Sequence, residues 1–193
     1  MKKPGLLLVI SGPSGAGKST ILREVTAKCP ELRFSVSATT REPRQGETDG
    51  VHYYFVNRER FEEMRRGLEL LENAEYAGNC YGTPAGPVLE SVGQGFVTVL
   101  DIEAKGAMQV RERHPDCVLV FICPSETAEV ERRLRERGTE SAEKIQKRMA
   151  ALEEQMAFVP KYDYYVVNDV LGDAVQSVLA IIEAERCRVS RRA

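Results

Sequence analysis

Four short and almost continuous apolar runs recur along the chain, and longer amphipathic segments separate them. The runs are Gly5–Ile10, Phe96–Leu100, Val118–Ile122 and Tyr164–Val167. A strand without polar alternation is typical of a sheet that is buried on both faces, and strands separated by helices are typical of parallel crossover connections. The pattern therefore predicts an α/β fold in which a parallel sheet lies between two layers of helices.

The segments between the runs carry helical signals. In the last of them, apolar residues recur with the i, i+3, i+4, i+7 spacing of a helix face: Val175, Val178, Leu179 and Ile182. Thr83 followed by Pro84 has the pattern of an N-cap and a first-turn proline, which predicts that a helix begins there. Two charged segments, Glu126–Arg137 and Glu143–Phe158, are also helical in character and flank Gly138.

The chain between residues 32 and 82 has a different pattern of apolar runs. Its strand-like runs, Phe34–Ser37, Tyr53–Val56 and Leu68–Tyr76, are short and are punctuated by glycines. This pattern predicts a small mixed β subdomain, inserted between the first helix and the next strand of the parallel sheet.

Composition narrows the class of protein. The 193 residues are enough for one domain with a sizeable core, and 27 Lys and Arg against 29 Asp and Glu leave a net charge of −2. This balance gives no support for a nucleic-acid or membrane-surface partner. No apolar run approaches the roughly 18 residues of a membrane span, and no signal peptide is recognised, so we expect a cytoplasmic protein. The five cysteines are an odd number and include no CxxC pair, so we expect neither a disulfide framework nor a zinc site.

The strongest local motif follows the first apolar run. Residues 12–19 fit the pattern GxxxxGK[ST] between a strand and the helical run Thr20–Lys28, which is the context that a phosphate-binding loop requires. Glycines let main-chain N–H groups converge on phosphate oxygens, and the following helix points its positive end at the same anion. The plain alternative is a flexible loop, which the flanking strand and helix disfavour. The predicted ATP-binding residues are Gly12, Pro13, Ser14, Gly15, Ala16, Gly17, Lys18, Ser19 and Thr20.

Lys18 and Ser19 have specific expected roles in this loop. Lys18 would reach the β- and γ-phosphates, and the Ser19 hydroxyl would ligate Mg²⁺. A second apolar run ends in the carboxylate of Asp101, a position that suits a partner for the metal, directly or through water. The sequence therefore predicts Mg²⁺ as the cofactor, held by Ser19 and Asp101.

A second anion site is expected farther along the chain. Arg41 and Arg44 lie three residues apart around Pro43, and Tyr53 follows shortly. Two guanidinium groups and a phenol suit a phosphate monoester. On spacing alone, a solvated basic loop is the favoured interpretation of these residues.

A longer series of motifs resembles the signature of the guanylate kinase family. The series runs in order from about Leu8 to Asp169 and consists of Thr39-Thr40-Arg41-x-x-Arg44-x-x-Glu47-x-x-Gly50-x-x-Tyr53-x-Phe55, Glu72, Gly78-Asn79-x-Tyr81-Gly82-Thr83, Asp101-Ile102, Arg133-Leu134-x-x-Arg137-Gly138-Thr139-Glu140, Arg148 and Val167-Asn168-Asp169.

The resemblance implies a role for each matching residue. Guanine would be read by Ser37, Glu72, Thr83 and Glu103, and the GMP phosphate would be held by Arg41, Arg44, Tyr53 and Tyr81, with Asp101 also on the GMP side. Arg133, Arg137 and Arg148 would close over the phosphates from a lid, and with Lys18 and Arg41 they form the expected catalytic set. Asn168 would lie near the adenine of ATP. Glu72 fits its role chemically, because a carboxylate accepts hydrogen bonds from both N1–H and N2–H₂ of guanine.

The resemblance also implies the reaction and the layout of the chain. The reaction is transfer of the γ-phosphoryl group of Mg-ATP to GMP, with dGMP expected as a second acceptor. The expected fold is a three-layer P-loop NTPase core, an inserted GMP-binding subdomain and a helical lid. Within a single domain of residues 1–193, the core would comprise residues 1–34, 84–124 and 151–193, the subdomain residues 35–83, and the lid residues 125–150.

Two positions depart from the family pattern, and two other functions remain open. Glu103 stands where the family has aspartate, and Lys105 stands where it has glutamine. A kinase for another nucleoside monophosphate would keep the phosphate loop but read the base with other residues. Guanylate-kinase-like modules that bind peptides typically lack the intact loop that Lys18 and Ser19 complete here. The oligomeric state is not determined by the sequence.

Overall fold

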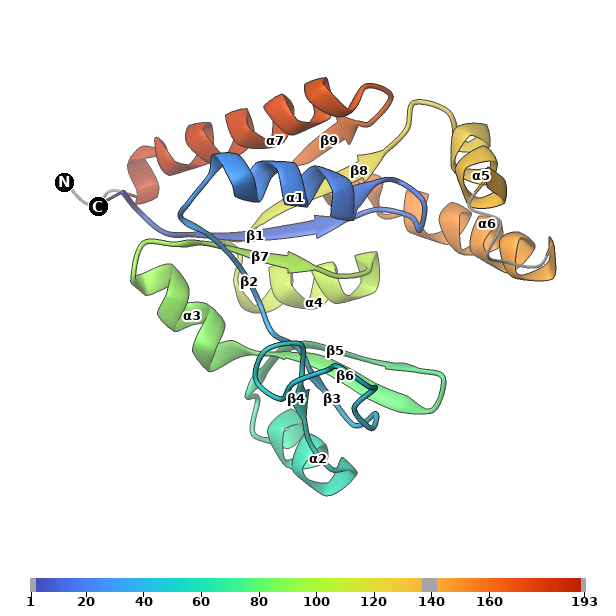
Figure 1. Cartoon of the computed structure of the whole chain (residues 1–193). Helices are drawn as coiled ribbons and strands as arrows, with labels where there is room; N and C mark the ends of the chain where they lie inside the picture. Colours follow the sequence, from blue (N-terminus) through green and yellow to red (C-terminus); the bar gives the residue numbers. More distant parts are fainter. Residues whose placement is uncertain (1–2, 137–141, 192–193) are drawn as a thin grey trace.

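The larger of two sheets forms the centre of the molecule (Figure 1). The computed structural model describes residues 3–136 and 142–191. Five parallel strands lie in the order β2-β7-β1-β8-β9. They span Leu32–Phe34 (β2), Val97–Asp101 (β7), Leu6–Ser11 (β1), Val118–Cys123 (β8) and Tyr164–Val167 (β9). The predicted α/β class with a parallel sheet is confirmed, and all four predicted strands are present.

Helices cover both faces of this sheet, as the continuous apolar strands predict. Leu6 and Leu8 of the central strand pack with α1 and α7, whereas Leu7 and Val9 point to the opposite face and pack with α3 and α4. Alternate side chains of one buried strand thus join two separate cores. The helices span Lys18–Lys28 (α1), Ala85–Gly93 (α3), Ala104–Arg113 (α4) and Leu171–Arg186 (α7).

Two local predictions are wrong. Phe34 ends the edge strand β2 of the large sheet instead of opening a strand of the subdomain, and Arg33 and Phe34 are exposed, so the strand has no apolar run to reveal it. Thr83 does not cap a helix. It lies inside a strand, and α3 begins at Ala85 with Pro84 in the cap position.

The smaller sheet is mixed and lies apart from the large one (Figure 1). Its strands, in the order β4-β3-β6-β5, span Tyr54–Phe55, Ala38–Thr39, Asn79–Pro84 and Leu70–Tyr76. The helix α2 (Arg58–Arg66) supplies Phe61 and Met64 to a small core that includes Leu70. Ala77 and Gly78, both with positive φ, connect β5 to β6, which is the geometry of a type I′ hairpin turn.

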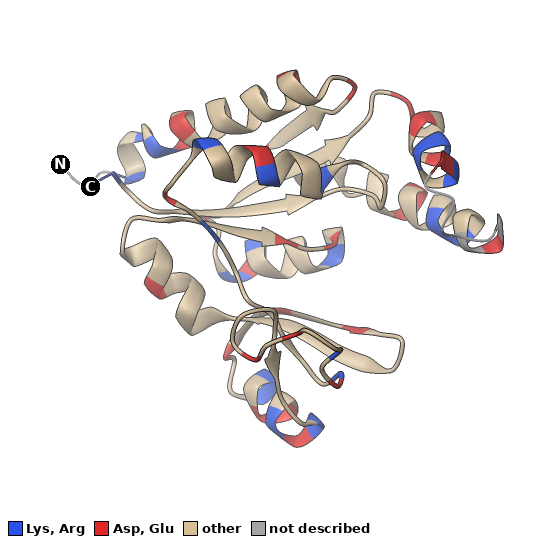
Figure 2. Cartoon of the chain, viewed as in Figure 1, with Lys and Arg blue, Asp and Glu red and all other residues tan. Residues whose placement is uncertain are grey.

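Two further helices, α5 (Thr127–Glu136) and α6 (Ala142–Met156), lie beyond the end of β8 and carry charges of both signs (Figures 1 and 2). Val130 and Leu134 of α5 and Leu152 of α6 pack in one cluster with Phe121 of β8. Arg137 and Gly138, which the sequence assigns to the connection between these helices, lie outside the described residues.

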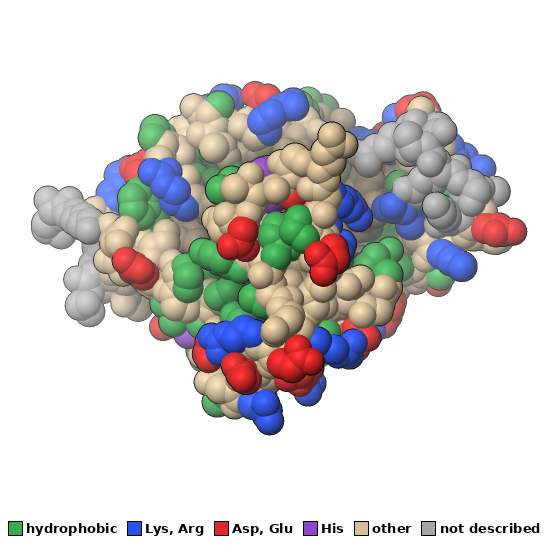
Figure 3. All heavy atoms as spheres, turned by 60° about the horizontal axis from the view of Figure 1, so that its bottom comes forward, with side chains coloured by type: hydrophobic (Ala, Val, Ile, Leu, Met, Phe, Trp, Pro, Cys, Tyr) green, Lys and Arg blue, Asp and Glu red, His purple; other side chains and the backbone are tan. Residues whose placement is uncertain are grey.

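The surface mixes charge and apolar area. On the face that Figure 3 shows, hydrophobic side chains gather near the middle and charged side chains of both signs lie around them. None of the helices that the structure describes is long and apolar enough to cross a membrane. Four of the five cysteines are buried and Cys187 is exposed, and none forms a disulfide.

Candidate active site

The loop between β1 and α1 is built around glycines at positions where any side chain would be strained. Gly12 has φ +149° and Gly17 has φ +87°. A β-carbon would lie 2.0 Å from the carbonyl oxygen of Ile122 at Gly12, and 2.3 Å from the side-chain nitrogen of Asn168 at Gly17. The loop therefore presents bare main chain at the N-terminus of α1, where N–H groups and the helix dipole favour an anion.

Lys18 lies folded over this loop. Its ammonium group donates to the carbonyl oxygens of Gly12 at 2.7 Å and Pro13 at 3.4 Å, and lies 3.9 Å from a carboxylate oxygen of Asp101. Loss of hydration lowers the pKa of Lys18 and raises the pKa of Asp101, and their mutual attraction opposes both shifts. The structure thus brings the ammonium group of Lys18, from α1, close to the carboxylate of Asp101, at the end of β7.

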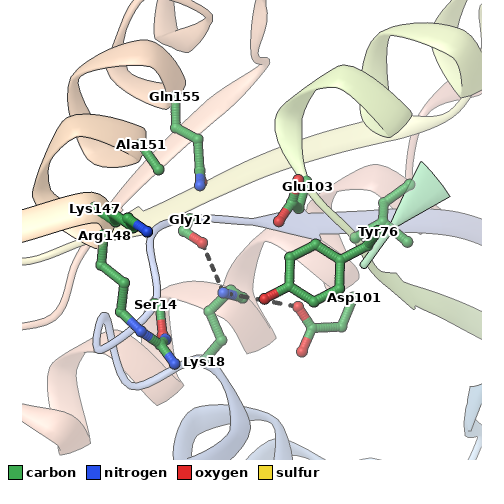
Figure 4. A pocket seen from close by; sticks show the side chains of 11 residues that line it. Gly12, Ser14, Lys18, Tyr76, Asp101, Glu103, Lys147, Arg148, Ala151 and Gln155 are labelled. Carbon is green, nitrogen blue, oxygen red and sulfur yellow. Dashed lines mark hydrogen bonds and ion pairs between the residues drawn. The ribbon is translucent and has the colours of Figure 1, made fainter. Parts of the chain in front are cut away.

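A cleft of about 730 Å³ opens beside this pair (Figure 4). Six of the predicted site residues line it: Gly12, Ser14, Lys18, Asp101, Glu103 and Arg148. Five lining residues were not predicted: Tyr76, Ile102, Lys147, Ala151 and Gln155. Charges of both signs and a phenol therefore surround a space large enough for a small ligand.

One face of α6 accounts for most of the unpredicted lining. Arg148, Ala151 and Gln155 follow the i, i+3, i+7 spacing of a helix face, and Figure 4 shows Arg148 and Gln155 projecting from α6 toward the loop. The Arg148 guanidinium donates to the Ser14 hydroxyl oxygen, and the Gln155 side-chain oxygen is buried without a hydrogen-bond partner among the described residues. Extending the helical period from Arg148 would have identified Gln155 from the sequence.

A second cleft, of about 410 Å³, lies on the other side of the loop and is lined by Gly15, Gly17, Thr20, Arg133 and Asn168, among others. The Asn168 amide donates to the carbonyl oxygen of Ala16 at 2.7 Å. The Arg133 guanidinium donates to the Asn168 carbonyl oxygen at 2.9 Å. Through these two hydrogen bonds Asn168, which is 5% exposed, connects the loop to α5.

Glu72 and Thr83 form a buried polar pair on neighbouring strands of the small sheet. The Thr83 hydroxyl donates to a Glu72 carboxylate oxygen at 2.7 Å, and Glu72 is 6% exposed. Burial raises the pKa of Glu72, and the hydrogen bonds from Thr83 oppose the rise. A buried carboxylate with so few donors is costly to the fold unless a ligand supplies more. The pair does not line the larger cleft.

Three predicted phosphate-binding residues meet in a second cluster on the small sheet. The Arg41 guanidinium donates to both carboxylate oxygens of Glu47, at 2.9 and 3.0 Å, and lies 5.4 Å from the centre of the Tyr53 ring. The Tyr53 and Tyr81 rings are 6.3 Å apart. Glu47 also accepts from the main-chain N–H of Arg44 at 2.7 Å, and the hydrogen bonds from Arg41 and Arg44 lower its pKa. The Arg44 side chain is exposed, and its charge also helps to lower the pKa of Glu47.

Ser37 and Glu103, which the resemblance assigns to the base, stand just before two different elements, β3 and α4. Ser37 is half-buried before β3, and its carbonyl oxygen accepts from Tyr54 N–H at 2.9 Å. Glu103 stands at the N-cap of α4 without capping it and faces the larger cleft. Lys105, two residues farther along the chain, forms an ion pair with Glu154 of α6 at 2.6 Å. The two departures from the family pattern, Glu103 and Lys105, thus line one small pocket between the start of α4 and α6.

Comparisons with known proteins agree on one family. A guanylate kinase family model matches residues 5–185. The chain is similar to the guanylate kinase of Desulfitobacterium hafniense, with 48% identity over 97% of this chain and 94% of the relative, and to that of Listeria monocytogenes, with 46% identity over 99% and 94%. The crystal structure of guanylate kinase from Anaplasma phagocytophilum is similar with a TM-score of 0.75 and 31% identity, over 99% of this chain and 91% of that one.

Proposed function

The chain belongs to the guanylate kinase family and is an enzyme that phosphorylates GMP with ATP. On this premise we propose which of its residues bind the two substrates and which stabilise the transferring phosphoryl group. In the proposal, the phosphate loop and Lys18 hold the triphosphate of ATP, and the small sheet holds GMP. The loop assignment is supported by the glycine geometry at Gly12 and Gly17 and by the Lys18 contacts inside the loop. Residues 13–16 and Ser19 and Thr20 complete this ATP site.

Mg²⁺ fits the oxygen donors at the start of α1 and the end of β7. The described residues hold no group of three or more His, Cys, Asp or Glu side chains that could form a complete protein cage. Mg²⁺ does not require one, because it is usually held by one or two oxygen ligands of the protein together with substrate phosphates. Ser19, exposed in the first turn of α1, and Asp101 would be those ligands. When bound, the ion would neutralise charge on the phosphate oxygens.

Glu72 and Thr83 would read the guanine base, with Ser37 and Glu103 nearer its edge. The single observation that carries this proposal is the buried Glu72 carboxylate with one side-chain donor, Thr83. Guanine brings two donors, N1–H and N2–H₂, to such an acceptor, whereas adenine brings none in the same place and would leave the carboxylate unpaired. Recognition at the base leaves the sugar free, and dGMP is proposed as a second acceptor.

The arginines would neutralise charge as the phosphates meet. Arg41 and Tyr53, with Tyr81 and Arg44, are proposed to hold the GMP phosphate, and Arg148 and Arg133 to approach from α6 and α5. Arg137 is proposed for the same set but lies outside the described residues. The charge-assisted Arg41–Glu47 pair supports the assignment, because it holds the guanidinium group in place before the substrate binds. Residues 35–83 and 125–150 are the proposed GMP-binding subdomain and lid.

The transfer itself needs no general base. A GMP phosphate oxygen, already anionic, forms the new bond to the γ-phosphorus of ATP, and the bond from that phosphorus to the β-phosphate oxygen breaks, which releases ADP and leaves GDP. Lys18 and the arginines would act by holding both anions in line and by stabilising the charge on the transferring group. Closure of α5 and α6 over the site would keep water from the γ-phosphate.

Steady-state kinetics of Glu72→Gln test the proposal. The amide presents a donor to the guanine donors, so we expect the KM for GMP to rise by about 10- to 100-fold, the range for hydrogen bonds to a charged group. The KM for ATP should stay within two-fold, because Glu72 lies away from the phosphate loop.

Glu75→Gln is the matched control, because Glu75 lies on the same strand with its side chain 58% exposed. Equal effects of Glu72→Gln on both substrates would refute the base-reading assignment. Activity of the unchanged enzyme on AMP, CMP or UMP at the level of GMP would likewise overturn the role of Glu72 and Thr83 while leaving the phosphate loop in place.

A further inference from the structure

One face of α4 lies against the strand that carries Glu72. Gly106, Gln109 and Arg113 follow the i, i+3, i+7 spacing, and each of them contacts β5 within three residues of Glu72. α4 begins directly after β7, the strand that ends in Asp101. A single helix therefore connects the phosphate-binding core to the base-reading strand.

Gln109 replaces a missing strand neighbour. β5 is the edge of the small sheet, so its outer main-chain groups have no strand to pair with. The Gln109 side-chain amide donates to the Asn73 carbonyl oxygen at 3.0 Å, and its side-chain oxygen accepts from the Asn73 N–H at 3.1 Å. This reciprocal pair fixes the peptide that directly follows Glu72, in the way that a neighbouring strand would.

Arg113 holds the same strand on the other side of Glu72. Its guanidinium donates to the carbonyl oxygen of Leu70, at the point where the pairing of β5 with β6 shifts register between Leu70 and Glu72. The shift leaves this stretch of β5 with a weaker ladder of its own. The positive charge of Arg113 also partly offsets the effect of burial on the pKa of Glu72.

Gly106 explains how α4 comes so close. A β-carbon at Gly106 would lie 3.1 Å from a Glu72 carboxylate oxygen and 3.4 Å from the Ile102 side chain. Glycine is less favourable than alanine inside a helix, and Gly106 does not have a positive φ, so the backbone conformation does not require it. Its reason is the space that the Glu72 carboxylate occupies.

We propose that Gln109 and Gly106 are positioning residues for guanine recognition: Gln109 fixes the main chain beside Glu72, and Gly106 leaves room for its carboxylate to meet the base. The proposal rests on the role of Glu72 given above. Neither residue touches the substrate in this account. Both act through Glu72, because a displacement of about 1 Å at a recognition group is enough to weaken binding greatly.

The first test is Gln109→Met, which keeps the length of the side chain and removes both hydrogen bonds. We expect the KM for GMP, and the dissociation constant of GMP measured by calorimetry, to rise about ten-fold, the loss that one to two hydrogen bonds represent. The KM for ATP should change less than two-fold. Glu112→Ala is the control, since Glu112 lies on the same helix and is exposed.

The second test, Gly106→Ala, separates positioning from stability. Alanine favours the helix, so the melting temperature should stay equal or rise, while the KM for GMP rises several-fold because the β-carbon displaces the Glu72 carboxylate. A structural role alone would lower the melting temperature of both variants and leave the KM for GMP unchanged, which would overturn the inference.

Measuring Glu72→Gln in the same series keeps the two proposals apart. If Glu72→Gln raises the KM for GMP and Gln109→Met and Gly106→Ala do not, the inference about α4 is wrong and the base-reading role stands. If Glu72→Gln itself has no effect on GMP, the base-reading role fails first, and a GMP effect of Gln109→Met would then need another cause.

Discussion

Glu72 works against the stability of the empty enzyme. Its carboxylate is 6% exposed, burial raises its pKa, and Thr83 is the one side chain that donates to it within the described structure. Groups of this kind destabilise a fold and persist where a ligand completes their hydrogen bonds. At the scale of the residue, stability and base recognition therefore oppose each other, which gives a prediction that needs no substrate.

Glu72→Gln should stabilise the protein in a pH-dependent way. The carboxyl group has a higher pKa in the folded chain than in the unfolded chain, so its favourable contribution is present at acid pH and is lost as the pH rises through the folded pKa. The amide does not titrate. We expect the variant to melt about 2–4 °C above the unchanged enzyme at pH 8, with the difference shrinking toward pH 4. A difference that is constant with pH, measured by scanning calorimetry, would contradict this account.

At the scale of the element, the loop between β3 and β4 is organised by one acidic side chain. Both carboxylate oxygens of Glu47 accept from one terminal nitrogen of the Arg41 guanidinium, and one of them also accepts from the main-chain N–H of Arg44, although none of these residues is in regular secondary structure. Thr39 adds a hydroxyl that accepts from Arg41 N–H at 3.2 Å and donates to the Cys80 carbonyl oxygen at 3.0 Å. The loop is thus held to β6 before a phosphate arrives.

Glu47→Gln should weaken GMP binding even though it removes a negative charge near a phosphate site. The amide is uncharged and offers one acceptor oxygen to the Arg41 nitrogen that otherwise donates to both carboxylate oxygens, so the guanidinium is held less firmly, and we expect the KM for GMP to rise about five- to ten-fold. Glu42→Gln, in the same loop and exposed, is the control. A fall in the KM for GMP would mean that Glu47 competes with the phosphate for Arg41 instead of orienting it.

At the scale of the whole molecule, the C-terminal end of α7 connects segments far apart in the chain. Arg186 is 3% exposed, and its guanidinium donates to the carbonyl oxygens of Pro4 at 2.9 Å and Gly95 at 3.0 Å and pairs with Glu31 at 3.6 Å. These contacts precede β1, β7 and β2 in turn. One side chain therefore holds the starts of three neighbouring strands. These starts lie at the amino ends of the strands, whereas the phosphate loop and Asp101 follow their carboxyl ends.

Arg186→Ala should destabilise the fold and spare catalysis. The change leaves two partly buried carbonyl oxygens without their donor, so we expect a loss of about 2–4 kcal/mol and a melting temperature about 5–15 °C lower. The kcat at 25 °C should remain within two-fold. Arg188→Ala is the control, because the Arg188 side chain is 57% exposed and its partner Glu185 keeps hydrogen bonds from Tyr164 and Arg191. Loss of activity without loss of stability would contradict the structural role.

The sequence predicted most of the fold and part of the site. The four apolar strands and the last helix were predictable because their signals are contiguous or periodic. β2 was not, because an edge strand with exposed Arg33 and Phe34 carries no apolar pattern. The helix cap predicted at Thr83 is wrong, because a threonine before a proline has the same local pattern whether its hydroxyl caps a helix or faces a carboxylate across a strand pair.

By itself, the sequence determined the α/β class, the phosphate loop and the family, since each depends on residues that are adjacent or regularly spaced in the chain. Only the tertiary structure decided three sets of contacts: the hydrogen bond between Thr83 and Glu72, the two hydrogen bonds between Gln109 and Asn73, and the contacts of Arg186 with the starts of three strands. These join residues between 11 and 182 positions apart. Their hydrogen bonds depend on strand register and on the approach of one element to another, and no local pattern of side chains encodes such distances.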